Sequence, residues 1–164
     1  MRQCADTLLM IRPSHFGFNP ETSVSNTFQN TSNQPNLASI AEDEFDGMVK
    51  RLQNENIQII CFNDIPKANT PDAVFPNNWI SLQHDGRAVL YPMATPNRRS
   101  ERRPEILELL QDQFAFTIDE IIDITQSEKN GEFLEGTGSI VFDHINQLAF
   151  ASLSQRTSSN VLNA

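Results

Sequence analysis

One order of secondary-structure signals occurs twice along this chain, with the two copies offset by about 60 residues. Each copy runs helix, strand, loop, strand, turn, strand. The apolar run Ile57–Phe62 predicts a buried strand, which matches the strand expected at Thr117–Ile122, and Trp79–Ser81 matches Ser139–Val141. Repeats of this size bury their apolar faces against one another, so the pattern predicts an α/β array or propeller.

Other signals place the remaining elements. Leu37–Asn54 has apolar residues at helical spacing, and Asp85-Gly86 is the strongest hairpin turn in the chain. Asn19–Asn36 is rich in Asn, Ser, Thr and Gln, which predicts a long and mobile loop. The other expected elements are a first strand, two hairpins, a second helix and the strand after it: Thr7–Ile11, Trp79–Gln83 with Arg87–Pro92, Ser139–Asp143 with Gln147–Leu153, Arg99–Asp112, and Phe116–Ile124.

The end of the chain carries the start of a third copy. Thr157 has the sequence position of an N-cap, and the helix after it would stop after about two turns. We therefore expect residues 1–164 to be the N-terminal part of a single larger domain, truncated within its third repeat.

Charge and cysteine content narrow the class of protein. The formal charge of −9 and the pI near 4.7 argue against a nucleic acid partner and against binding to an anionic membrane. The chain has no signal peptide pattern and no apolar run of about 20 residues, so a cytoplasmic protein is expected. Cys4, Cys61 and the three scattered histidines make no metal-binding pattern, and no cofactor-binding motif is present.

Acidic and amide side chains in two loops are candidates for binding a substrate. Asp72 and Glu135 precede or follow apolar residues in loops, where a carboxylate can hold a planar cation. Asn77 and Asn78 are adjacent amides that could orient a polar group. The structural alternatives are a loop cap for Asp72, turn formation for the two asparagines and an ordinary glycine turn around Glu135.

Arginines supply the complementary charge. Arg98-Arg99 and Arg102-Arg103 place four arginines within six residues, and Arg156 follows the last expected strand. A guanidinium group can grip a carboxylate with its planar fork. The alternatives are a solvated helix start for Arg98 and Arg99 and a surface position for Arg156.

Three segments together resemble the amidinotransferase-type superfamily of guanidine- and ureido-modifying enzymes. They are Pro71–Ser81 followed by Tyr91–Met93 and Asn97–Arg99, then Phe133–Ser139, and then Leu153–Thr157. Ile11–Pro13 and Phe16–Asn19 are similar to the bacterial citrulline-utilisation hydrolase branch, and the chain is also similar to dimethylarginine dimethylaminohydrolase and arginine deiminase. The resemblance runs essentially end to end, and the motifs are specific in combination.

The resemblance implies an α/β fold, the pentein propeller of five ββαβ blades. This chain would hold about two and a half of them, a partial α/β-propeller. It also implies roles for the candidate residues. Asp72 and Glu135 would hold guanidino or ureido nitrogens, and Arg98 or Arg99, together with Arg156, would meet the α-carboxylate of an arginine- or citrulline-like amino acid.

The sequence departs from the family pattern in two places. Asn77 and Asn78 stand where relatives carry Glu-Asp or Arg-Asp, and Gly136-Thr137-Gly138 replaces the usual Gly-Gly-Asp. Both departures remove charge, which suits a neutral ureido group such as that of citrulline. The family uses a Cys nucleophile and a His acid–base, and neither Cys4 nor His144 matches them.

Several functions therefore stay open. The first is C–N hydrolysis or amidino transfer in which this chain needs a missing half for its covalent step. The second is a non-catalytic half-propeller that binds an amino acid, a C-terminal half or a second copy of itself. The third is an inactive gene fragment. Whether the chain alone is an enzyme is left open by its sequence.

Overall fold

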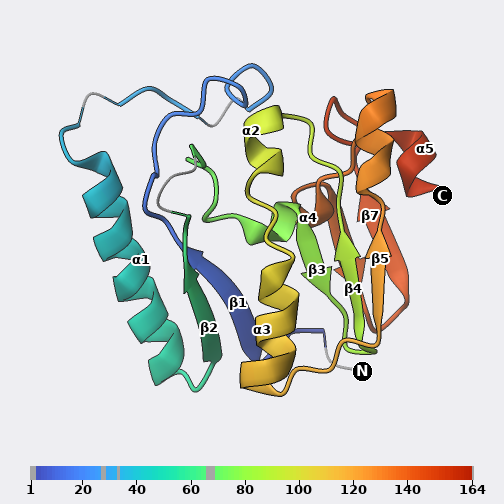
Figure 1. Cartoon of the computed structure of the whole chain (residues 1–164), viewed down its shortest axis with the longest axis horizontal. Coiled ribbons are helices and arrows are strands. Elements are labelled where there is room, and N and C mark those ends of the chain that lie inside the picture. Colours follow the sequence, from blue (N-terminus) through green and yellow to red (C-terminus); the bar gives the residue numbers. More distant parts are fainter. Residues whose placement is uncertain (1–2, 27–28, 33, 66–68, 164) are drawn as a thin grey trace. The chain divides into compact units, whose positions relative to one another are not determined.

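The computed structural model describes residues 3–26, 29–32, 34–65 and 69–163. Contacts divide the chain into two compact units (Figure 1): residues 1–76 with 143–147, and residues 77–142 with 148–164. We call them the first and the second unit. No helix among the described residues is long and apolar enough to cross a lipid bilayer.

The first unit is built from two parallel strands and one helix. Strand β1 (Thr7–Arg12) pairs with β2 (Gln58–Asn63), and α1 (Leu37–Asn54) is the crossover that connects them. The helix lies alongside both strands (Figure 1), and its Phe45 is buried. At the end of β1, Arg12 donates two hydrogen bonds to the Asp46 carboxylate, which lower the pKa of Asp46.

The second unit contains a complete ββαβ blade. Strands β3 (Ile80–Leu82) and β4 (Arg87–Leu90) form the hairpin that Asp85-Gly86 predicts, and Gly86 has a φ of 81°. Helix α3 (Glu105–Phe114) then leads to β5 (Glu120–Asp123), which pairs with β4 in parallel. The strand order is therefore β3-β4-β5.

Two incomplete blades accompany the complete one. The path β1-α1-β2 joins two parallel strands through a helix, as β4-α3-β5 does. Strand β6 (Ile140–Asp143) and strand β7 (Leu148–Ala151) form a hairpin sheet like β3-β4. The repeat predicted from the sequence is confirmed in this element order, and the chain has a partial α/β-propeller fold.

Short helical turns surround the second unit's core. Tyr91, Leu134 and Ile140 form part of this core, against which the C-terminal Val161 and Leu162 pack. The turns are η1 (Pro76–Asn78), α2 (Pro96–Arg99), η2 (Thr125–Asn130), α4 (Gly136–Ser139) and α5 (Ser159–Leu162).

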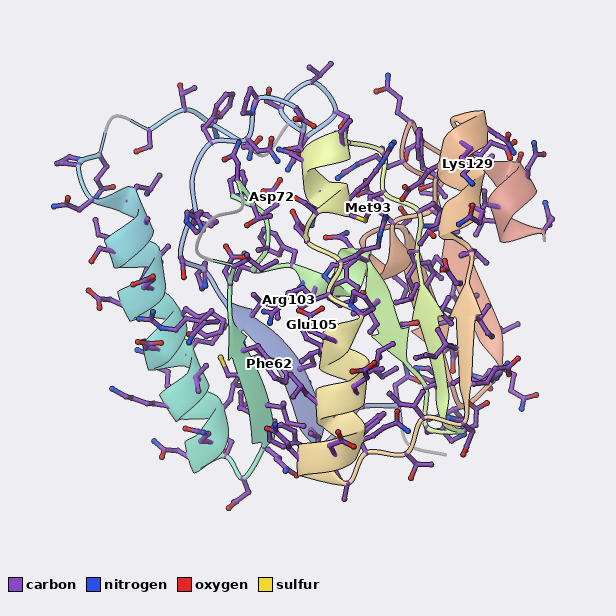
Figure 2. All side chains as sticks on the ribbon, viewed as in Figure 1. Phe62, Asp72, Met93, Arg103, Glu105 and Lys129 are labelled. Atoms are coloured by element: carbon purple, nitrogen blue, oxygen red, sulfur yellow. The ribbon has the colours of Figure 1, made fainter. Side chains whose placement is uncertain are left out.

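The prediction of one helix over Arg99–Asp112 is wrong for the first half of that range. The structure has the short α2, an irregular link and then α3, which begins directly after Pro104. A proline has no N–H to continue a helix and disfavours helical backbone before it, so the helix restarts there. Arg103 and Glu105, labelled in Figure 2, flank this proline, with 2.8 Å between Nε and Oε1.

Two other expectations need correction. Strand β2 was expected to be buried, but Cys61 is exposed and Ile60 is the buried apolar residue. A helix that packs on a two-stranded sheet covers one face, whereas the apolar run indicated two covered faces. The last helix is a single turn whose N-cap is Ser158, because Thr157 is instead bridged to Leu134 and Ser154.

The Asn19–Asn36 loop is in part ordered by hydrogen bonds, although its composition predicts mobility. Residues 19–26 form consecutive turns, among them Ser23 N to Asn19 O at 3.0 Å and Asn26 N to Thr22 O at 2.9 Å. Residues 27–28 and 33 of this loop lie outside the described part.

Candidate functional site

Asp72 is a buried carboxylate in the loop that follows β2. Figure 2 labels it among the loops beyond the carboxyl ends of β1 and β2, the edge where open α/β sheets place their ligand sites. The side chain is in the first unit and accepts hydrogen bonds from Asn19 (2.6 Å) and Thr22 (3.1 Å). Burial of a carboxylate is costly unless donors surround it, and these two donors supply part of that compensation.

Glu135 is the most deeply buried acid of the second unit, with 1% of its surface exposed. Its Oε1 accepts the backbone N–H of Ala94 at 3.1 Å. Its Oε2 lies 3.4 Å from an Arg156 nitrogen and 3.7 Å from an Arg98 nitrogen. The carboxylate is therefore held between two guanidinium groups and one amide.

Arg98 is held by a second buried acid, Glu101. The guanidinium donates to both carboxylate oxygens of Glu101, with Nε to Oε1 at 3.0 Å and Nη2 to Oε2 at 2.9 Å. Nη2 also donates to the Asn78 side-chain oxygen at 3.2 Å. Arg98 has only 3% of its surface exposed, and its guanidinium group lies buried between Glu101, Glu135 and Asn78.

The loop Glu135–Gly138 packs directly on the Asn77-Asn78 backbone and side chains. A Cβ at Gly136 would lie 2.3 Å from Asn77 O, and one at Gly138 would lie 2.0 Å from Asn78 Nδ2. The Thr137 hydroxyl donates to Asn77 O at 3.3 Å. Glycine is therefore needed at position 136 for the close approach that brings Glu135 and Asn78 into one cluster, because its nearest neighbours are backbone oxygens.

Arg99 belongs to a neighbouring network. It donates to the backbone oxygens of Met93 (3.0 Å) and Ala94 (3.2 Å), and its guanidinium lies 5.8 Å from the Phe133 ring centroid. Glu128 lies 3.4 Å from Arg99, accepts the Met93 N–H and pairs with Arg102. This network supports the backbone at Met93 and Ala94, the same backbone that donates to Glu135.

Arg156 is the more accessible of the two arginines on Glu135, with 29% of its side chain exposed. The backbone around it is fixed by Thr157, whose hydroxyl donates to Ser139 Oγ at 2.7 Å. A side chain in this position can reach a ligand carboxylate while one of its nitrogens stays near Glu135.

The sequence-predicted residues thus fall into two groups. Asp72 lies in the first unit, and the second unit brings together Asn78, Arg98, Glu135 and Arg156. The exposed Asn77 and the half-buried Arg99 lie beside them in the same unit. Their roles in ligand binding stay predictions. Sequence reasoning missed Glu101, Glu128, Asn19 and Thr22, although Glu101 stands three residues after Arg98, at a spacing that favours ion pairs on a helical turn.

The surroundings of Cys61 are not those of an activated nucleophile. Cys4 and Cys61 are both exposed, and partial desolvation raises the pKa of the Cys61 thiol, which disfavours its thiolate. No group of three or more metal-ligating side chains occurs within the described ranges.

Comparison with solved structures reveals the same fold in enzymes. The substrate-bound N-terminal domain of ArgZ, an arginine dihydrolase from the ornithine–ammonia cycle in Cyanobacteria, matches with a TM-score of 0.65 and 18% identity over 94% of this chain and 51% of its own. A dimethylarginine dimethylaminohydrolase adduct matches with a TM-score of 0.64 and 17% identity over 96% of this chain and 52% of its own.

A third structure is the ternary complex of AgrE with ornithine and NAD+, with a TM-score of 0.66 and 17% identity over 94% of this chain and 20% of AgrE. The chain therefore spans about half the length of the first two relatives. No curated protein sequence matches it. The family model described as N,N dimethylarginine dimethylhydrolase, eukaryotic, matches residues 12–164, and the chain belongs to this family.

Proposed function

We propose that this chain supplies the substrate-cradling half of a guanidino- or ureido-group hydrolase. Its ligand is an arginine- or citrulline-type amino acid. The observation that carries the proposal is Glu135, which is nearly fully buried and yet held between Arg98, Arg156 and the Ala94 amide. An ordinary glycine turn does not need a carboxylate kept out of water in this way.

Each end of the ligand has a chemical partner. In the first unit, Asp72 is an acceptor for the N–H groups of a guanidino or ureido head. In the second unit, Glu135 is such an acceptor, and Asn77 and Asn78 add neutral donors and acceptors. Arg156 meets the α-carboxylate, with Arg99 or Arg98 as the second cation. Neutral amides beside the acids favour citrulline over arginine, because a ureido group carries no charge to be matched.

The covalent step requires groups that this chain does not provide. In the family, a Cys thiolate attacks the guanidino or ureido carbon and a His transfers protons, and here Cys61 is disfavoured as a thiolate. We therefore infer that the chain alone binds without turnover, in a cytoplasmic setting that fits its two free cysteines.

Isothermal titration calorimetry of the 164-residue chain with L-citrulline, L-arginine and agmatine tests the proposal. Glu135→Gln keeps the shape of the side chain but removes its charge, and is expected to weaken citrulline binding about tenfold or more, since a charge-assisted hydrogen bond is lost. Glu120→Gln, on the exposed edge of β5, is the matched control and should bind as the wild type does.

Two results would contradict the proposal. Equal affinity of Glu135→Gln and wild type, with both proteins folded by circular dichroism, would remove Glu135 from the ligand site. Citrulline turnover by the lone chain would overturn the claim that it lacks its nucleophile.

The hairpin β6-β7 favours an additional role in association. Strand β7 pairs with β6, whereas β4, its counterpart in the complete blade, has a parallel partner on its other side. Apolar side chains of this hairpin are exposed, among them Phe150 at 59% and Leu148 at 53%. An open edge with an apolar face pairs readily with another chain, so we propose association with a C-terminal half or with a second copy.

Light scattering coupled to size-exclusion chromatography measures this association. We expect the wild-type chain to exceed its monomer mass of 18.5 kDa at micromolar concentration and Phe150→Asp to shift it towards the monomer. Val24→Asp changes another exposed apolar residue, in the first unit, and should leave the mass unchanged. A wild-type chain that stays monomeric at every concentration would refute self-association.

A further inference from the structure

Two polar side chains of the loop after β1 are buried against Asp72. Asn19 has 0% and Thr22 has 2% of its surface exposed. Asn19 Nδ2 donates to Asp72 Oδ2 at 2.6 Å, and the Thr22 hydroxyl donates to the same oxygen at 3.1 Å. These bonds link residues 53 and 50 positions apart in the chain. A segment with the composition of a mobile loop is thereby attached to a candidate substrate-binding acid.

The local backbone is shaped to present both donors. The Asn19 side-chain oxygen accepts Glu21 N–H at 3.1 Å, which leaves the amide nitrogen for Asp72. The Asn19 carbonyl accepts Ser23 N–H, and the Thr22 carbonyl accepts Asn26 N–H. Two consecutive turns therefore hold Asn19 and Thr22 at the spacing that puts both side chains on one carboxylate oxygen.

Gln29 completes this arrangement. In the orientation of its amide that satisfies all partners, the nitrogen donates to Asn19 O (2.9 Å) and to Thr22 Oγ1 (3.2 Å). The amide oxygen then accepts the Asn19 N–H (3.1 Å). A hydroxyl has one hydrogen, so a Thr22 oxygen that accepts from Gln29 can direct its own hydrogen to Asp72. The Thr22 hydrogen then has two acceptors, Asp72 Oδ2 at 3.1 Å and Asn19 O at 3.4 Å, and the shorter distance favours Asp72.

The same loop has a second attachment to the segment that carries Asp72. His15 Nδ1 lies 3.1 Å from Asp64 Oδ2, and the Thr70 hydroxyl is 3.0 Å from both Asp64 oxygens. Asp64 is also buried. The buried carboxylates of Asp64 and Asp72 are therefore both bonded to side chains of residues 15–22.

We propose that Asn19 and Thr22 are positioning residues that orient the Asp72 carboxylate toward the guanidino or ureido head of the ligand. The inference rests on the proposed function, in which Asp72 binds that head. Asn19 and Thr22 hold Oδ2 with two hydrogen bonds, which restrict rotation of the carboxylate about its Cβ–Cγ bond. A planar head group with paired N–H donors is recognised only when the carboxylate plane matches its own.

The test is a binding cycle on the intact chain with L-citrulline. Thr22→Val preserves shape but removes the hydroxyl and is expected to weaken binding about tenfold, the usual loss for a hydrogen bond to a charged group. In an Asp72→Asn background the same change should have little further effect, because the carboxylate it positions is gone. Thr22→Ser restores the hydroxyl and should recover most of the affinity.

Asn19→Ala is expected to act in the same direction as Thr22→Val, and Ser23→Ala, which removes a hydroxyl of the same turn that bonds Pro20 O, is the matched control. Wild-type affinity in Thr22→Val, together with weakened binding by Asp72→Asn, would overturn the inference and leave the proposed function intact. Equal losses from Thr22→Val in both backgrounds would assign Thr22 a general structural role and also overturn it. Absence of citrulline binding by the wild-type chain would overturn the proposed function, and the inference with it.

Discussion

Glu101→Leu is expected to lower the free energy of unfolding by about 3–5 kcal/mol, because it leaves the buried Arg98 guanidinium without its main counter-charge. Glu101 accepts hydrogen bonds from Arg98 at both carboxylate oxygens, and both side chains are almost inaccessible to water. Glu135, at 3.7 Å, is already shared with Arg156 and is a weaker partner. Urea unfolding followed by circular dichroism measures the loss.

The double variant Arg98→Met/Glu101→Leu completes a mutant cycle that measures the coupling free energy between the two side chains. Removal of both charges avoids an unpaired buried ion, so its destabilisation should fall short of the sum of the single changes by about 0.5–3 kcal/mol. Glu105→Leu breaks the exposed pair with Arg103 and should cost less than about 1 kcal/mol. A Glu101→Leu protein as stable as the Glu105→Leu control would show that the buried pair does not hold the fold.

The order of elements was predictable from the sequence because it depends on local patterns. The spacing of apolar residues gave α1 its observed bounds, Leu37–Asn54, and Asp85-Gly86 placed the first hairpin. The helix predicted over Arg99–Asp112 begins too early, because Pro104 interrupts the helix and α3 starts only at Glu105. The burial of strands could not be predicted, since it depends on which faces other elements cover. Cys61 in β2 and all four residues of β7 are exposed although their sequences are apolar.

The sequence is enough to select candidate residues, but it does not show which side chains contact them. Loop positions and glycines pointed to Asp72 and Glu135, and the structure places Glu135 with Asn78, Arg98 and Arg156. Arg98 can be buried because it donates hydrogen bonds to Glu101 and to Asn78, which lies 20 residues earlier in the chain. Asp72 accepts a hydrogen bond from Asn19, which lies 53 residues earlier. Local sequence patterns do not encode contacts at such separations.

Gly136→Ala is expected to cost about 2–5 kcal/mol, the sum of an unfavourable backbone conformation and overpacking. Gly136 has a φ of 32°, and a Cβ there would lie 2.3 Å from Asn77 O and 3.1 Å from both Asn78 O and the Tyr91 ring. Two of these three neighbours are backbone atoms, which cannot rotate away as a side chain can. The substitution must therefore push the Glu135 loop off the Asn77-Asn78 backbone.

Gly131→Ala isolates the backbone contribution. Gly131 also has a positive φ, 70°, but nothing lies within 4 Å of its added Cβ, so the variant should lose about 1–2 kcal/mol through conformation alone. The difference between the two unfolding free energies then measures the packing of the Glu135 loop. Equal losses would mean that the loop yields without cost, and Glu135 would then lack the rigid support that a site for a planar head group requires.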